Sequence, residues 1–318
     1  MDGCFVIDKP AGLTSHDVVA RVRKIVGERR VGHTGTLDPF ATGVLVVLVG
    51  RATRLAQFLS GAEKEYAAVI RLGYATDTGD VTGQRVPDEE NQSHAKAQST
   101  PSFRKEEIEG ALASLRGDIE QTPPMYSAKK IAGRKLYELA RRGEEVERKA
   151  IRVKVREFEV VTRDGALLKP NDDGTCDLGV RVVCSAGTYV RALAEVFGQH
   201  LGLGAHLAEL RRTRAGRFKI EDAITLDGLN EQAQTGSIEN SKISPANAVS
   251  HLPAVELGAE DFGRTLHGID TRVENPGSCD WSGGQPVRML DMKGDLVAVG
   301  TYDDAGKSIH PAVVIANK

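Results

Sequence analysis

The distribution of apolar and polar residues predicts several elements in the first half of the chain. Residues 44–49 (VLVVLV) form an unbroken apolar run bounded by glycines, which is typical of a fully buried strand. Apolar residues recur at helical spacing over 18–26, predicting a helix that begins at Thr14 or Ser15 and ends at Gly27. The other elements expected here are strands at 4–7 and 64–72 and helices at 52–59 and 103–115.

The second half predicts a more even mixture of helices and strands. Alternating apolar residues predict a strand at 152–161, and the apolar run at 178–184 predicts another. Thr188 is expected to cap a helix over 189–201, and a second helix is expected over 205–212. The remaining expectations are an extended segment at 121–128, a helix at 133–142 ended by Gly143, a turn-rich connection at 169–177 and a mobile polar loop at 87–102.

The C-terminal part predicts a separate small module. Residues 229–250 are polar and are expected to form a linker. Short strands are expected near 287–290, 296–301 and 312–315, with a turn at 302–306 between the last two. This pattern favours a small β-rich module at the end of the chain.

Composition limits the class of protein. The chain has 318 residues, of which 40% are hydrophobic and 27% charged, as is ordinary for a globular protein with one large domain and one small one. No apolar stretch reaches the roughly 18 residues of a membrane span, and the N-terminus does not resemble a signal peptide, so a cytoplasmic protein is expected. The four cysteines are scattered, so neither a zinc site nor a disulfide framework is indicated.

Charge is unevenly distributed, although the formal net charge is only −2. Residues 129–156 contain eleven Lys or Arg and four Glu, a local net of +7, and residues 211–219 contain five basic residues and no acid. Residues 227–270 contain seven acids and two bases, a local net of −5. This segregation favours a basic face that clamps nucleic-acid phosphates. The alternative is a surface that is basic without a binding function.

The segment Gly32–Gly50 holds a single acid, Asp38, among glycines, threonines and apolar residues. Pro39 fixes its own φ angle and disfavours the helical region for Asp38. A lone carboxylate therefore lies on a stiff loop anchored to the strand at 44–49. A turn Asp before a Pro is the alternative, but His33 and several small hydroxyls in the same uncharged loop favour a site.

This segment resembles the catalytic motif of the TruB family of tRNA pseudouridine synthases. Four further stretches support the resemblance, which follows the family's order and covers roughly residues 1–225. The resemblance is to the bacterial enzymes, so it implies isomerisation of uridine 55 to pseudouridine in the T-arm of tRNA. The four stretches are Ile7–Asp17 (IDKPAGLTSHD), Arg71–Gly83 (RLGYATDTGDVTG), Gln121–Gly143 (QTPPMYSAKKIAGRKLYELARRG) and Cys184–Phe218 (CSAGTYVRALAEVFGQHLGLGAHLAELRRTRAGRF).

The implied reaction breaks an N–C glycosidic bond, turns the uracil and forms a C–C bond. It needs no redox change and no external group, so no cofactor and no metal are expected; the sequence has no P-loop, GxGxxG or HExxH motif. Hydrolytic glycosidases typically use two carboxylates. In this family one aspartate acts as nucleophile or charge partner, and whether it attacks base C6 or sugar C1′ stays open.

The resemblance implies three catalytic residues. Asp38 matches the reacting aspartate, and Arg191 matches the arginine that pairs with it, since an ionised carboxylate in a dry pocket needs a cation. Tyr66 matches the aromatic residue that stacks on the target base. The alternatives are a helix-surface role for Arg191 and a core role for Tyr66.

Four further residues are expected to bind the substrate. The target uridine lies in a folded loop and must be extruded, and His33 matches the histidine that occupies the vacated space. A hydrogen-bonded loop residue is the alternative for His33. Tyr189 is expected to support the pocket and Leu210 to line it. Lys9 matches a family motif beside the active-site strands, where a structural role is expected first.

The resemblance implies an α+β fold: a catalytic domain at 1–228 on a mixed, mainly antiparallel sheet, a linker at 229–250 and a PUA-like RNA-binding module at 251–318. The expected partner is the T stem-loop of tRNA, with no guide RNA and no membrane, and a monomer is expected. One rival is a non-catalytic RNA-binding or RNA-folding protein, against which the intact catalytic residues argue. The other is a synthase inside a guide-RNA complex, which the short tail and the lack of long basic extensions disfavour.

Overall fold

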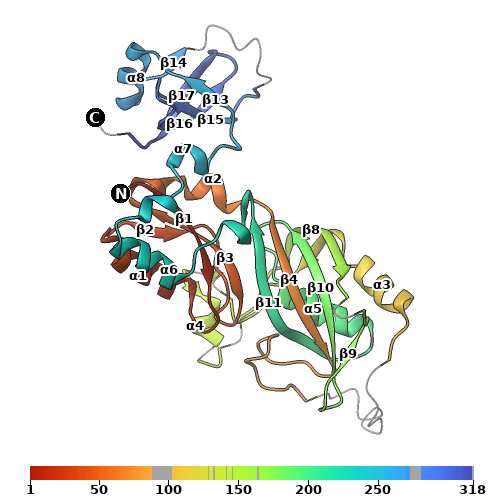
Figure 1. Ribbon diagram of the computed structural model, residues 1–318. Coiled ribbons are helices and arrows are strands. Elements are labelled where there is room, and N and C mark those ends of the chain that lie inside the picture. Colours follow the sequence, from red (N-terminus) through yellow and green to blue (C-terminus); the bar gives the residue numbers. More distant parts are fainter. Residues whose placement is uncertain are drawn as a thin grey trace.

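Figure 1 shows a computed structural model in which a large sheet with its helices is joined to a smaller C-terminal module. The structure describes residues 1–87, 102–127, 129–131, 133–140, 142–144, 146–162, 165–272 and 281–316. The mobile loop expected at 87–102 lies, apart from its two ends, outside the described residues. Within them, no helix combines the length and apolarity that a membrane crossing requires.

The large sheet has the strand order β1-β3-β11-β4-β10-β8-β5. Among the pairs along this order, β3 and β11 run parallel and the other five pairs are antiparallel. The expectation of an α+β fold on a mixed, mainly antiparallel sheet is therefore confirmed. The strands are β1 (Gly3–Lys9), β3 (Thr42–Val49), β11 (Ala205–Ala215), β4 (Lys64–Leu72), β10 (Cys176–Cys184), β8 (Ile151–Val160) and β5 (Gly117–Gln121), with β2 (Val31–His33), β9 (Lys169–Pro170) and β12 (Phe218–Lys219) beside them.

The centre of this sheet departs from the sequence prediction. The sequence predicts a helix over residues 205–212, but the structure places β11 there, between β3 and β4. Ala, Leu, Glu and Arg favour helices, yet pairing with two neighbouring strands outweighs that weak preference. Register shifts at Leu207/Glu209 and Arg212/Arg214 also break the strict alternation by which a strand is recognised.

The helices predicted for this domain are largely confirmed. Helix α1 (Ser15–Val26) begins at a capping box on Thr14 and ends at Gly27. It packs with β1 and β3 around one core cluster. Helices α3 (Lys105–Ala113) and α5 (Val190–His200) pack with β4 and β10 around another. The residue that precedes α5 is Tyr189 rather than Thr188, and it provides no side-chain cap.

The shorter elements agree less closely with the sequence. The helix expected at 52–59 is a 3-10 turn, η1 (Gly50–Leu55), followed by α2 (Ala56–Ser60). Where a helix is expected at 133–142, the described residues form a two-strand hairpin and a single helical turn. These elements are β6 (Lys130–Ile131), β7 (Arg134–Lys135) and α4 (Leu136–Ala140).

The C-terminal module is a five-stranded sheet with its own core, so the predicted β-rich module is confirmed. Three predicted strands are present, and the turn between the last two falls at 304–307 rather than 302–306. The sequence did not indicate β13, α8 or β14. The elements are β13 (Ala254–Glu256), α8 (Ala259–Leu266), β14 (Thr271–Arg272), β15 (Pro286–Leu290), β16 (Leu296–Asp303) and β17 (Ser308–Val314).

The polar stretch expected as a linker packs against the large sheet. Leu229 is fully buried among residues of β1 and α1. Ile243 pairs with Cys4 through two backbone hydrogen bonds of 2.9 Å. The division at residues 228 and 250 stays a prediction. The elements of this region are η2 (Ile220–Asp222), α6 (Leu226–Gln234), η3 (Ile238–Asn240) and α7 (Pro245–Ala248).

Candidate active site

The loop that carries Asp38 is fixed by side chains from three other elements. The ammonium of Lys9 donates to the carbonyl oxygens of Pro39 at 3.2 Å and Ala41 at 2.6 Å. The buried hydroxyl of Ser15, at the start of α1, accepts from the backbone N–H of Leu37 at 2.9 Å. These contacts hold the backbone on both sides of Asp38. Lys9 is fully buried and does not line the cavity described below, so its position fits the expected structural role.

Arg212 of β11 holds the same loop from a third direction. Its guanidinium donates to the carbonyl oxygens of Gly35 at 3.0 Å and Val44 at 2.7 Å. Gly43 permits this close approach, because a Cβ atom there would lie 2.2 Å from the carbonyl oxygen of Arg212. The φ angle of Gly43 is also +98°, which side chains disfavour. The parallel pairing of β3 and β11 therefore positions the Asp38 loop.

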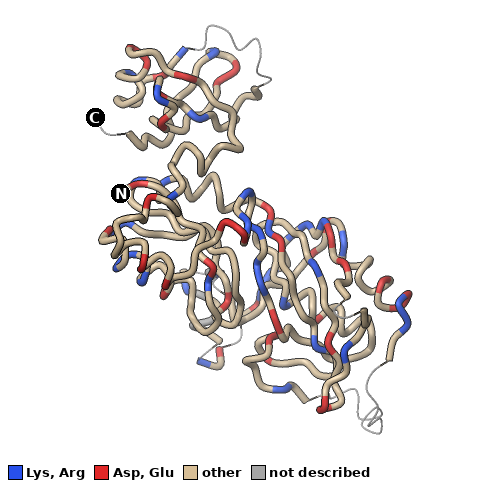
Figure 2. Tube along the Cα trace, in the orientation of Figure 1, with Lys and Arg blue, Asp and Glu red and all other residues tan. Residues whose placement is uncertain are grey.

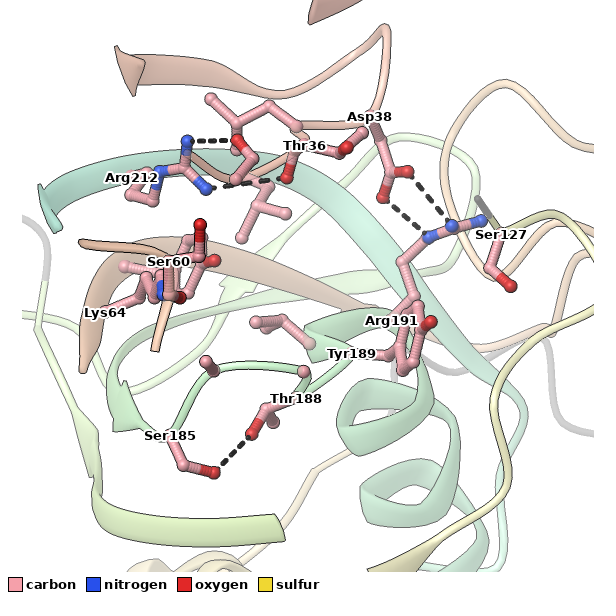
Figure 3. Close-up of a pocket in the computed structure, with 17 residues that line it drawn as sticks. Thr36, Asp38, Ser60, Lys64, Ser127, Ser185, Thr188, Tyr189, Arg191 and Arg212 are labelled. Atoms are coloured by element: carbon pink, nitrogen blue, oxygen red, sulfur yellow. Dashed lines mark hydrogen bonds and ion pairs between the residues drawn. The ribbon is translucent and has the colours of Figure 1, made fainter. Parts of the chain in front are cut away.

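Asp38 and Arg191 form a two-point ion pair (Figure 3). Arg191 Nε lies 2.9 Å from Asp38 Oδ2, and Nη2 lies 3.1 Å from Oδ1. The rest of the guanidinium donates to the carbonyl oxygens of Thr78 and Tyr126, both at 2.7 Å. Burial raises the pKa of Asp38 above its ordinary value, and the Arg191 charge opposes that rise. The structure thus brings together the two residues expected to pair, and it fixes the orientation of the pair.

Asp80 is a second acid at this pair, and the sequence analysis did not assign it a role. Its carboxylate lies 3.6 Å from Arg191 Nη1 and is buried. It accepts hydrogen bonds from the backbone N–H of Thr82 at 2.9 Å and from the hydroxyl of Thr78 at 3.0 Å. The Asp80 charge adds to the rise in the pKa of Asp38. Only the fold brings Asp80 to Arg191, because 111 positions separate them in the chain.

A cavity of about 250 Å³ opens beside Asp38. Tyr66 of β4 and Leu210 of β11 line it, as expected, and both side chains are buried. Tyr189 also lines it, and its backbone is held by Gln121 through two hydrogen bonds of 2.7 and 3.0 Å. Burial raises the pKa values of Tyr66 and Tyr189, so both hydroxyls stay protonated near neutral pH. An aromatic and aliphatic lining with one carboxylate suits a flat, partly polar ligand.

His33 lies outside this cavity, on β2 at the start of the Asp38 loop. Its Nδ1 accepts from the backbone N–H of Gly35 at 3.3 Å, and its ring packs edge-on against His16 at 5.5 Å. Burial, with the neighbouring His16 charge, lowers the pKa of His33 to about 4, so the ring is neutral near pH 7. The structure thus places His33 in the loop, as a neutral group next to the site.

Two buried cations that the sequence prediction did not assign also line the cavity. They are Lys64 of β4 and Arg212, and each is less than 10% exposed. Lys64 precedes Tyr66 by two positions, which puts both side chains on one face of a strand. That spacing was the available signal for Lys64. Arg212 could not be found in the same way, because its segment was assigned to a helix.

The two basic segments lie in different environments. In residues 211–219, Arg211 pairs with Asp8 at 2.8 Å and Arg214 pairs with Glu63 at 2.9 Å. In the other segment, the Arg152 side chain is 90% exposed. Figure 2 shows basic and acidic residues side by side across the strands of the large sheet. The segment at 211–219 therefore contributes less free positive charge than its composition predicts.

Among the described residues, no group of three or more His, Cys, Asp or Glu side chains is arranged to hold a metal ion. The described cysteines (Cys4, Cys176 and Cys184) are free and buried. The charged groups that line the cavity are the Asp38–Arg191 pair, Lys64 and Arg212, and two tyrosines and several Ser and Thr hydroxyls accompany them. That set can orient and stabilise charge on a bound nucleobase.

Comparison with known sequences identifies the class. A profile for the N-terminal domain of TruB family pseudouridylate synthases matches residues 23–190, and one for the C-terminal domain of tRNA pseudouridylate synthase B matches 191–248. The chain belongs to the TruB family of pseudouridylate synthases, which are isomerases. The resemblance found in the sequence is confirmed.

Individual relatives cover nearly the whole chain. The protein named tRNA pseudouridine synthase B of Heliobacterium modesticaldum is 40% identical over 300 residues, which cover 94% of this chain and 90% of that protein. Its namesake from Geobacillus thermodenitrificans is 44% identical over 273 residues, 86% of each chain.

Solved structures show the same fold. A chain in an H/ACA RNP bound to a substrate RNA containing 2′-deoxyuridine has a TM-score of 0.71 at 26% identity, over 99% of this chain and 85% of that one. A chain in a Cbf5–Nop10–Gar1 complex has a TM-score of 0.70 at 30% identity, over 99% and 84%.

Proposed function

We propose that this protein converts uridine 55 in the T-arm of tRNA to pseudouridine, with Asp38 as the reacting carboxylate. The observation that carries the proposal is the Asp38–Arg191 ion pair beside a cavity lined by Tyr66 and Leu210. This arrangement presents one oriented carboxylate to a flat ligand held between an aromatic ring and an aliphatic side chain.

The cavity requires the target base to leave the RNA stack. Its walls are side chains of β4, β11 and the start of α5, so a base inside it cannot remain paired or stacked with its neighbours. His33 lies in the same loop as Asp38 but outside the cavity. That location suits a group that occupies the space the base has left.

Arg191 favours the ionised form of Asp38 and orients its carboxylate. Attack on base C6 and attack on sugar C1′ both need the carboxylate form, because the protonated acid is a poor nucleophile and a poor partner for positive charge. Burial alone would favour the protonated acid. The two-point contact with Arg191 counteracts this, and the bonds from Arg191 to Thr78 and Tyr126 prevent the guanidinium from turning away.

The choice of tRNA as substrate is supported by the relatives. Proteins named tRNA pseudouridine synthase B are 40–44% identical to this chain, whereas the chains from the H/ACA and Cbf5 complexes are 26–30% identical. We therefore infer an enzyme that acts without a guide RNA, and we further propose that it is cytoplasmic and monomeric. The resemblance of the sequence motifs to the bacterial enzymes supports position 55.

The test uses the pure protein and a tRNA transcript carrying uridine tritiated at C5. We expect tritium release without any added RNA or protein, and mass mapping should find pseudouridine at position 55 alone. A transcript with cytidine at position 55 should release no tritium. Tight binding without release would establish the RNA-binding rival, and release only after addition of a guide RNA would establish the guide-dependent one.

A further inference from the structure

Lys64 and Arg212 lie next to each other at the side of the cavity away from the Asp38–Arg191 pair (Figure 3). A Cβ atom built on Gly35 would lie 3.6 Å from Arg212 Nη1 and 3.9 Å from Lys64 Cε, so both cations approach the same point. Lys64 Nζ donates to the carbonyl oxygens of Ser60 and Ala62, both at 2.5 Å. Within the described chain, the third N–H of this ammonium has no acceptor.

Neither cation is neutralised by a carboxylate among the described residues. Arg191, on the other side of the cavity, has Asp38 at 2.9 Å and Asp80 at 3.6 Å. Lys64 and Arg212 donate to carbonyl oxygens, and Arg212 also contacts the hydroxyl of Tyr66. Burial of two adjacent cations is unfavourable unless negative charge reaches them. This side of the cavity is therefore built to receive an electron-rich group of the ligand.

We propose that Lys64, supported by Arg212, donates a hydrogen bond to a carbonyl oxygen of the flipped uracil and stabilises the negative charge of the detached base. This inference rests on the proposed function. When the C1′–N1 bond breaks, its electron pair stays on the base and spreads over N1, O2 and O4. A C1′–C5 bond then forms, the proton on C5 leaves, and N1 gains a proton.

The symmetry of uracil lets one cation serve before and after the base turns. Rotation about the line through N3 and C6 exchanges N1 with C5, and it also exchanges O2 with O4. A donor fixed at the position of one carbonyl oxygen therefore meets a carbonyl oxygen in both orientations. Lys64 is fixed in this way by Ser60 and Ala62, and Tyr66, two residues further along β4, lines the same cavity.

If Lys64 acts as a charged donor, the reaction rate should depend on its protonation state and therefore on pH. Burial, together with the Arg212 charge, lowers the pKa of Lys64 to about 8, so the ammonium is lost as the pH rises through 8. The charged or titratable groups that face Lys64 are Arg212 from β11 and Cys184 from β10. Burial raises the pKa of the Cys184 thiol to about 11, and Arg212 stays charged, so neither changes between pH 7 and 9.

The experiment compares Lys64→Met and Lys64→Arg with wild type, and uses Lys169→Met, on the exposed strand β9, as the matched control. Single-turnover tritium release from tRNA gives the rate, and filter binding gives the affinity. Lys64→Met should lower the rate by about a hundredfold to a thousandfold, the loss seen when one preorganised donor is removed, with affinity within about twofold of wild type. Lys64→Arg should retain most of the rate, and Lys169→Met all of it.

The pH profile separates this role from a packing role. At limiting protein concentration, the wild-type rate should fall above about pH 8. Lys64→Arg should show a smaller fall there, because its own charge persists while Lys9, whose pKa burial also lowers to about 8, still loses its charge. A folded Lys64→Met protein with the wild-type rate would overturn the proposal. So would weaker binding with a flatter salt dependence and a normal rate at saturation, which would indicate a phosphate contact.

Two outcomes need separate treatment. If Lys64→Met does not fold, the pH–rate profiles of wild type and Lys64→Arg test the role of Lys64 instead. Superimposable profiles would overturn the proposal. If wild type itself releases no tritium, the proposed function fails first. Release by wild type together with an unaffected Lys64→Met protein removes only the role of Lys64.

Discussion

The basic segments at 129–156 and 211–219 place several of their arginines in different surroundings. Arg211, Arg212 and Arg214 lie on the central strand β11, where carboxylates and carbonyl oxygens of neighbouring segments accept their hydrogen bonds. The side chain of Arg152 lies almost wholly in solvent on β8. A count of charges along a sequence therefore measures how many cations exist, not how many a polyanion can reach.

The difference separates two uses of arginine in one molecule. Cations inside the fold hold the active-site loop and its carboxylate, so they should determine turnover and stability. Cations on the outside are free to exchange their counterions for phosphates, so they should determine affinity and its dependence on salt.

The largest effect is expected at the internal ion pair. Asp38→Asn keeps the size of the side chain and removes the charge and the nucleophile, so turnover should fall by at least about a thousandfold. Affinity for tRNA should stay within a few-fold, because phosphate contacts supply most of it. Tritium release and filter binding measure the two quantities. Normal turnover of Asp38→Asn would remove the assignment of the reacting group.

The second acid should have a smaller internal effect. Asp80→Asn leaves Asp38 and Arg191 in place but removes the 3.6 Å contact that helps to orient the guanidinium. We expect the single-turnover rate to fall by roughly a hundredfold, as for a small misplacement of a reacting group, with affinity unchanged. Asp77→Asn, in the same loop but without this contact, is the control. Equal losses in both variants would indicate general disturbance of the loop.

The external residues should affect binding instead. Replacement of Arg142, Lys149 and Arg152 by Ala should weaken affinity by roughly tenfold per lost phosphate contact near 0.1 M salt. The slope of log affinity against log salt should decrease by about one for each such contact. The rate at saturating protein should be unchanged. An unchanged slope would place the RNA on another face of the molecule.

A matched pair of single variants tests the same separation in finer detail. Arg214→Gln on β11 removes partly buried ion pairs with Glu63 and Glu65, so the free energy of unfolding should fall by about 1 kcal/mol with no change in the salt slope. Arg152→Gln on β8 should lower the slope and leave stability unchanged. Urea denaturation and filter binding measure both. A lower salt slope for Arg214→Gln and lower stability for Arg152→Gln would refute the separation of internal from external arginines.

The smallest effect is expected at His33, which lies outside the cavity. His33→Ala should slow the modification of folded tRNA by several-fold more than that of an unstructured oligonucleotide with the same sequence, since only the folded RNA must be opened. Competition between the two substrates in one reaction gives the ratio directly. Equal slowing of both substrates would indicate that His33 only packs against His16 and does not assist the opening of the RNA.

The sequence predicted the elements whose local signals agree with their surroundings. The cap at Thr14, the apolar run of β3 and the alternation in β8 each gave boundaries within a few residues. β11 failed because its residues favour a helix and its two bulges hide the alternation. Only contacts across the sheet decide its conformation, and those contacts are not visible along the chain.

The residues of the candidate site likewise divide into those that sequence motifs indicate and those whose roles depend on the fold. Five residues of the site stand in sequence motifs, and the structure brings them to one cavity: Asp38, Arg191, Tyr66, Tyr189 and Leu210. The roles argued for Asp80, Lys64 and Arg212 depend on which groups they meet in three dimensions. Each meets partners from other elements, and only Lys64, two positions before Tyr66 on one strand, had a signal in the sequence.

The place of β11 in the sheet has a consequence for synthesis. β3 and β4 follow each other in the chain but do not pair, because β11, which ends at Ala215, lies between them. A nascent chain shorter than about 215 residues therefore has no strand to join its two halves, and no Leu210 or Arg212 to form the cavity. Such late, long-range insertion is slow and leaves strand edges open meanwhile. Catalytic competence should thus arise only after translation has passed β11, as the last event in folding of the sheet.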